Sequence, residues 1–120
     1  MFAGLLLTGC ASPSDGAVTA AARSFVDSLQ RRDGAAACRL LTPDARQATT
    51  GATDASCAEA ITSVHEQGDK VSGVQVWGDA AQVRIGGDAL FLRRVDGRWL
   101  ISAAGCKPQP AGPYDCAAGG

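Results

Sequence analysis

Five cysteines and one histidine are the side chains of this 120-residue chain best suited to metal, redox or covalent chemistry. Thiolates bind metals, exchange disulfides or carry a covalent group, and histidine transfers protons near neutral pH. No two cysteines have the Cys-x-x-Cys spacing of zinc and redox sites, and the single histidine is His65. The residues therefore disfavour a metal site and a catalytic dithiol, and we expect no cofactor.

Cys10 follows a short apolar run, and the segment Leu7-Thr8-Gly9-Cys10 resembles the lipobox of bacterial lipoproteins. The resemblance implies export, cleavage before Cys10 and a diacylglycerol on its sulfur. Residues 1–9 would be the signal peptide and residues 10–16 a lipidated tether that anchors the chain to the outer face of the cell membrane. Signal peptides begin with basic residues, and none precedes Cys10, so we expect the natural start upstream of Met1. The alternative is a buried N-terminal strand with a free cysteine.

The other four cysteines are Cys38, Cys57, Cys106 and Cys116. An exported chain folds in an oxidising compartment, where structural disulfides are common. Four cysteines allow three pairings, and we prefer the nearest-neighbour pairing of Cys38 with Cys57 and of Cys106 with Cys116. The first disulfide would connect two helices, and the second would tie the C-terminal tail to the last strand.

No catalytic residue is assigned. His65 lies near the end of a predicted helix without a serine or cysteine partner, which is typical of a solvated histidine. The chain contains no phosphate-binding glycine loop, dinucleotide fingerprint or zinc-protease motif. Asp79, Asp88 and Asp96 are explained by the turns in which they are predicted to lie.

The clearest predicted elements lie between Val71 and Cys106. Alternating apolar runs are separated there by Gly-Asp, Gly-Gly-Asp and Asp-Gly, which are typical of tight hairpins. This pattern predicts four consecutive antiparallel strands, at about Val71–Trp77, Ala81–Gly86, Ala89–Val95 and Arg98–Ala104.

These strands carry five candidate pocket or surface residues, which are Arg84, Arg93, Arg94, Trp77 and Trp99. Successive residues of a strand point to opposite faces. At least one of Arg93 and Arg94 can therefore reach over the open face of the sheet or into a concavity. The alternative is that the arginine stems lie along an exposed sheet face and the tryptophans fill the core.

The N-terminal part is predicted to be helical, with apolar residues at helical spacing over Ala17–Arg32. Further helices are expected at Gly34–Leu41 and Cys57–Val64. Between them we expect a turn or short helix at Ala45–Thr49 and a loop at Thr50–Asp54. The tail after Ala104 is expected to be irregular. The helices must cover one face of the sheet, so residues 17–120 are predicted to form a single α+β domain.

Composition excludes some classes of function. Eleven Lys and Arg against twelve Asp and Glu leave no basic excess for phosphate binding, so nucleic acid is not an expected partner. No segment approaches the ~18 consecutive apolar residues of a membrane-spanning helix. Aromatic residues make up 5% of the chain, which predicts a core of small aliphatic side chains.

The run FVDSLQRRDGAAACRLLTP (25–43) resembles the opening of small actinobacterial lipoproteins related in pattern to the nuclear-transport-factor-two-like, SnoaL-like superfamily. The closing pattern of Phe91-Leu92, Asp96 to Trp99, Cys106 and Tyr114 to Cys116 is similar as well. The resemblance implies a cone-shaped α+β fold, in which three N-terminal helices pack on a curved four-stranded antiparallel meander. It also implies a pocket inside the cone.

The leading hypothesis is a membrane-anchored, non-enzymatic module that binds a protein partner or a small apolar ligand. The alternatives are a small cone-pocket enzyme of isomerase or dehydratase type, and an accessory subunit that forms a homodimer through the open sheet face. A buried acid beside an arginine in a cleft would favour the enzyme. An aliphatic pocket would favour ligand binding, and a large apolar outer face would favour a protein partner.

Overall fold

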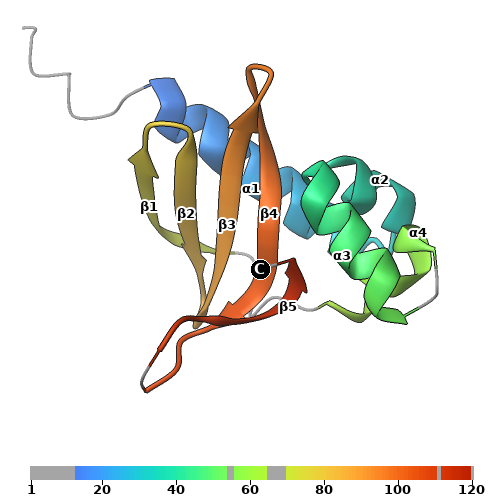
Figure 1. Cartoon of the computed structure of the whole chain (residues 1–120). Helices are drawn as coiled ribbons and strands as arrows, with labels where there is room; N and C mark the ends of the chain where they lie inside the picture. Colours follow the sequence, from blue (N-terminus) through green and yellow to red (C-terminus); the bar gives the residue numbers. More distant parts are fainter. Residues whose placement is uncertain (1–12, 54–55, 65–69, 111, 120) are drawn as a thin grey trace, which may run out of the picture.

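The structure is a computed structural model that describes residues 13–53, 56–64, 70–110 and 112–119. Its helical N-terminal half is followed by an antiparallel sheet, as expected for an α+β domain (Figure 1). The predicted lipidation site at Cys10 and the histidine His65 lie outside the described residues. Within the described residues, no helix has the length and apolar character needed to cross a membrane.

The sheet has five antiparallel strands in the order β1-β2-β3-β4-β5. They are β1 (Val71–Trp77), β2 (Ala80–Ile85), β3 (Asp88–Val95), β4 (Arg98–Lys107) and β5 (Asp115–Gly119). The first four follow the predicted hairpins closely. Positive φ angles at Gly78, Gly86, Asp96 and Gly97 give these turns the backbone conformation that tight hairpins require.

The fifth strand corrects the prediction of an irregular tail and a four-stranded sheet. β4 continues past Ala104 to Lys107, where it pairs with Asp115, and Cys106 pairs with Cys116. The sequence of β5 is Asp-Cys-Ala-Ala-Gly, which contains no β-branched or aromatic residue and therefore lacks a strand signal. Pairing with β4, and not local preference, makes this segment a strand.

The helical half consists of α1 (Pro13–Gln30), α2 (Gly34–Arg39), α3 (Pro43–Thr53), α4 (Cys57–Ala60) and the 3₁₀ helix η2 (Ile61–Ser63). Instead of the three predicted helices, four α-helices are therefore present in the described part of the chain. α1 begins at Pro13 and not at Ala17, so residues 13–16 of the expected tether are helical. Proline is well suited to the first turn of a helix, because that position needs no intrahelical N–H bond.

α3 (Pro43–Thr53) is the largest difference in the helical half, because only a turn or short helix at Ala45–Thr49, followed by a loop at Thr50–Asp54, was predicted there. Thr42 caps its start, where its Oγ1 accepts a hydrogen bond of 3.1 Å from the Ala45 N–H. Further along, the buried Thr49 hydroxyl donates to the Ala45 carbonyl at 2.8 Å. The Thr-Thr-Gly run has low helix propensity, and packing of this segment against β4 and β5 outweighs it. The segment predicted as one helix at Cys57–Val64 is instead divided into α4 and η2.

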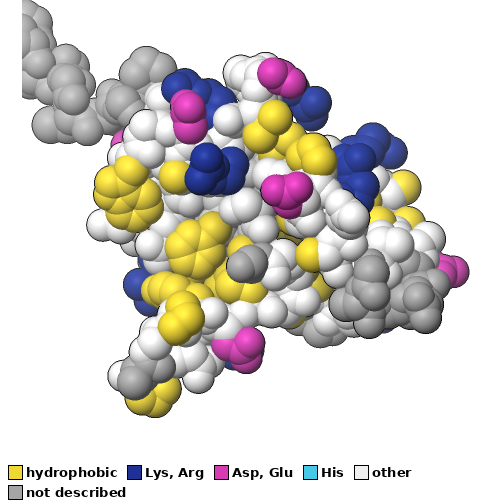
Figure 2. All heavy atoms as spheres, viewed as in Figure 1, with side chains coloured by type: hydrophobic (Ala, Val, Ile, Leu, Met, Phe, Trp, Pro, Cys, Tyr) yellow, Lys and Arg dark blue, Asp and Glu magenta, His cyan; other side chains and the backbone are white. Residues whose placement is uncertain are grey.

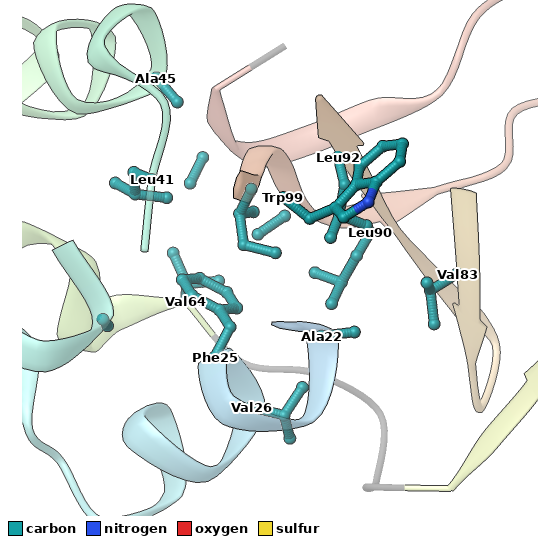
Figure 3. Packing of buried hydrophobic residues seen from close by; sticks show 14 of the residues in the cluster. Ala22, Phe25, Val26, Leu41, Ala45, Val64, Val83, Leu90, Leu92 and Trp99 are labelled. Carbon is teal, nitrogen blue, oxygen red and sulfur yellow. The ribbon is translucent and has the colours of Figure 1, made fainter. Parts of the chain in front are cut away.

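The core lies between α1 and one face of the sheet (Figures 1 and 3). Phe25 of α1 is fully buried and belongs to the same packed cluster as Leu90, Leu92 and Ile101 of the sheet. Trp99 also belongs to this cluster and is 9% exposed. The space between α1 and the sheet is therefore filled with side chains.

Two disulfides have the nearest-neighbour pairing that the sequence predicted. Cys38 is bonded to Cys57 and joins α2 to α4, and Cys106 is bonded to Cys116 and joins β4 to β5. α2 and α4 also approach closely at Gly34, where a Cβ would clash with the carbonyl of Ala58. Glycine at this position is therefore required by packing.

The connection between α2 and α3 pairs with β4 at Ile101. It uses the same edge of β4 that pairs with β5 further along the strand. The Thr42 N–H donates to the Ile101 carbonyl at 2.8 Å, and the Ile101 N–H donates to the Leu40 carbonyl at 2.7 Å. This short parallel bridge places the start of α3 next to β4. As a result, α3 and β5 both lie along the same edge of the sheet (Figure 1).

Candidate binding groove on the outer face of the sheet

The sheet has an outer face, opposite α1, whose residues are identified by the strand register. Phe91 of β3 pairs with Gln82 of β2 and with Ala103 of β4. In the next row, Arg93 pairs with Ala80 and with Leu100. Because Leu90 and Leu92 point into the core, alternation directs Phe91 and Arg93 to the outer face. Figure 2 shows hydrophobic side chains gathered on this face of the molecule.

A groove of about 950 Å³ lies on the outer face, between the start of α3, the strands β3 and β4, and the tail that leads into β5. Its lining includes Asp44, Ala48, Phe91, Arg93, Val95 and Tyr114. Its lining is predominantly apolar, and its volume is within the range of small-molecule sites. The groove is thus separate from the filled space between α1 and the sheet.

An aromatic pair forms one wall of the groove. The ring of Tyr114 meets the ring of Phe91 edge to face, with centroids 5.3 Å apart and an interplanar angle of 71°. The Gln82 amide donates a hydrogen bond of 3.3 Å to the Tyr114 hydroxyl. The Cys106–Cys116 disulfide lies two residues beyond Tyr114, and Cys116 itself lines the groove. The disulfide therefore holds the tail in the position that brings Tyr114 onto β3.

Two opposite charges line the groove. Among the described residues that line it, Arg93 is the single cation and Asp44 the single acid. Both side chains are exposed, and neither forms an ion pair or side-chain hydrogen bond with another described residue. Their charges are free to meet a bound molecule.

The five candidate residues of the strands separate into different environments, and Arg93 is the one that lines the groove. Arg94 points to the other face, where its Nη2 lies 2.6 Å from Asp79 Oδ1 and its guanidinium lies 5.6 Å from the ring centroid of Trp99. Trp99 is a core residue. Arg94 and Trp99 therefore have structural partners and are not groove residues.

Trp77 and Arg84 remain on the surface. Trp77 is 56% exposed at the end of β1, in the row that contains Ala80 and Arg93. Arg84 is exposed and pairs across the sheet with Ala89, but it does not line the groove. Both residues lie on the outer face of the sheet but do not line the groove.

Asp88 is a buried acid that turn chemistry alone does not explain. It is 2% exposed, and its Oδ1 lies 3.0 Å from Lys107 Nζ, while its Oδ2 is buried and has no hydrogen-bond partner in the part of the chain that the structure describes. The two residues are 19 positions apart in the sequence, so only the pairing of β3 with β4 brings them together. Asp88 does not line the groove, so we interpret Asp88 and Lys107 as a structural ion pair.

Sequence reasoning missed most of the groove, including Asp44, Phe91 and Tyr114. Tyr114 lies in the tail after Ala104, which was predicted to be irregular. The available signal was the position of Tyr114 two residues before Cys116, since a disulfide to β4 brings it to the sheet. No group of three or more metal-ligating side chains occurs in the part of the chain that the structure describes.

Comparisons of the chain with protein-family models, with curated proteins and with solved structures give no match.

Proposed function

We propose that this chain is the extracytoplasmic domain of a membrane-anchored lipoprotein, and that it acts by binding a small ligand in the groove on its outer face. The observation that carries the binding role is the groove itself, which combines a volume of about 950 Å³ with an aromatic wall and two charges that have no ionic partner among the described residues. Binding in such a groove requires no reacting group. This is why we favour a binding module over an enzyme.

The anchored location is supported by the lipobox-like segment that ends at Cys10 and by two disulfides, which are typical of exported domains. The proposed SnoaL-like cone is supported by one long helix, α1, packed across an antiparallel sheet. In this proposal the ligand does not occupy the interior of the cone, because Phe25, Leu90 and Leu92 fill that space. The ligand binds on the opposite face of the sheet.

Native mass spectrometry of the protein, extracted gently from its own membrane, tests both parts. We expect a mass that starts at Cys10, carries acyl chains and is short by four hydrogens, two for each disulfide. We also expect an additional retained small molecule. A reduced and unlipidated chain that still includes the residues before Cys10 would overturn the proposed membrane anchoring. A protein without a retained molecule would overturn the proposed ligand binding.

A groove-filling variant localises the retained molecule. Ala48 is exposed on α3 and lines the groove, so Ala48→Phe adds bulk there without entering the core. Ala20→Phe adds the same bulk at an exposed position of α1 outside the groove. We expect the first variant to lose the molecule and the second to keep it. Retention of the molecule by Ala48→Phe would mean that it binds elsewhere.

A further inference from the structure

The two charges of the groove lie on opposite sides of β4. Arg93 pairs with Leu100 of β4, and the Thr42 N–H donates to Ile101 on the other edge of the same strand. Two strand spacings of ~4.8 Å separate the backbones of residues 93 and 42 by about 10 Å. Asp44 follows Thr42 by two residues. A molecule lying across β4 therefore meets a cation on one side and an anion on the other.

Neighbouring charges do not neutralise this pair. The cross-strand partners of Arg93 are Ala80 and Leu100, which offer no acid. The basic residue closest in sequence to Asp44 on α3 is Arg46, and its Nε donates to the Cys38 carbonyl at 3.2 Å. By contrast, Arg94 and Lys107 each have an acidic partner. Unlike Arg94 and Lys107, Arg93 and Asp44 have no oppositely charged partner among the described residues.

The rest of the lining is suited to an apolar group. Phe91 and Tyr114 supply aromatic surface, and Ala48, Val95 and Pro113 supply aliphatic surface. Burial of apolar atoms against such a surface contributes about 25 cal/mol per Å². A singly charged amphiphile would satisfy one of the two charges and bring the other close to a like charge or leave it unpaired.

We propose that the groove binds a small zwitterionic amphiphile, with its anionic group on Arg93, its cationic group on Asp44 and its apolar part against Phe91 and Tyr114. This inference rests on the proposed binding function and names the chemical class of the ligand. A guanidinium holds a phosphate or carboxylate through charge-assisted hydrogen bonds. A carboxylate on the opposite side holds an ammonium, and the two contacts together select against molecules of a single charge.

Isothermal titration calorimetry on the full oxidised chain tests the assignment with three probes of equal chain length, each below its micelle concentration. The probes are octylphosphocholine, octanoate and octylamine. We expect octylphosphocholine to bind about tenfold more tightly than either singly charged probe at low ionic strength, where exposed charges are least screened. Phosphocholine without the octyl chain is expected to bind at least tenfold more weakly than octylphosphocholine, because it lacks the apolar contact.

Matched variants identify the two charges. Arg93→Gln is expected to weaken octylphosphocholine binding five- to tenfold and to leave octylamine binding unchanged or tighter. Asp44→Asn is expected to weaken octylphosphocholine similarly and to leave octanoate unchanged or tighter. The controls are Arg84→Gln, on the same face outside the groove, and Glu59→Gln on α4, both of which are exposed. We expect neither control to change the affinity for any probe.

Amide chemical shifts of Ala48 and Val95 report occupancy of the groove independently of the heats. Equal affinities for the three octyl probes would overturn the assignment of a zwitterionic ligand, as would equal effects of Arg93→Gln and Arg84→Gln. In either case, chemical-shift changes at Ala48 and Val95 would still show that a ligand occupies the groove. An absence of shifts with every probe would also overturn it. The molecule retained by the native protein then decides separately whether the proposed binding function holds.

Discussion

Adjacent residues in this chain have different roles because strand alternation separates them. Arg93 and Arg94 follow each other in β3, yet Arg93 lines the groove and Arg94 binds Asp79 beside Trp99. The sequence predicted that they point to opposite faces, because that follows from backbone geometry alone. It did not indicate which of the two would face a groove, since Asp79 becomes a partner of Arg94 only through the pairing of β2 with β3.

At the residue scale, Gly34→Ala tests the close approach of α2 to α4. The new Cβ would clash with the Ala58 carbonyl, a backbone atom that cannot rotate away. We expect a loss of about 1–3 kcal/mol in the free energy of unfolding, as for other overpacked sites. Urea denaturation monitored by circular dichroism measures it.

Gly16→Ala is the matched control, because nothing lies within 4 Å of its added Cβ on α1. It is expected to stabilise the protein by up to about 1 kcal/mol through helix propensity. If Gly34→Ala stabilised the protein as Gly16→Ala is expected to do, helix propensity would explain its effect and the contact with Ala58 would be ruled out as the dominant one.

At the scale of elements, the groove depends on how the tail is held. β5 pairs with β4, and the Cys106–Cys116 disulfide fixes the segment that carries Tyr114 against Phe91. The other wall is α3, which is placed by the hydrogen bonds of Thr42 and Leu40 to Ile101. The two walls of the groove are therefore placed along the edge of one strand, β4, by two segments distant in sequence.

The double variant Cys106→Ala/Cys116→Ala tests the wall formed by the tail. We expect it to lose the Phe91–Tyr114 contact, seen as loss of the nuclear Overhauser effect between the rings, and to bind octylphosphocholine at least fivefold more weakly. The variant Cys38→Ala/Cys57→Ala removes a disulfide outside the groove and is expected to keep both properties. A ring contact that persists without Cys116 would show that strand pairing alone positions Tyr114.

At the scale of the whole molecule, two disulfides supplement a core made largely of small side chains. Among the described residues, Phe25 is the largest fully buried side chain of the core, and alanine contributes eight of the buried members, which are Ala22, Ala37, Ala45, Ala81, Ala89, Ala103, Ala104 and Ala118. Such residues bury little area each. The disulfides connect different parts of the fold, one within the helical half and one within the sheet. Their contributions are therefore expected to be additive.

Reduction of both disulfides is expected to lower the free energy of unfolding by about 6 kcal/mol, because loops closed over 19 and 10 positions contribute about 3 kcal/mol each in the chain-entropy description. That is a large part of the 5–15 kcal/mol of an ordinary domain. Thermal unfolding with and without a phosphine reductant measures the change. A midpoint that did not fall on reduction would show that the core alone supplies the stability.

The sequence by itself determined the hairpins from β1 to β4, because they follow from local chemistry such as Asp-Gly turns with positive φ. The nearest-neighbour pairing of the cysteines was a preference among three possible pairings, and the structure contains that pairing. Tertiary structure alone decided the strand β5, the length of α3 and the groove. Each of these depends on pairing or packing against β4, which brings together residues such as Asp44, Arg93 and Tyr114 that carry no shared signal along the chain.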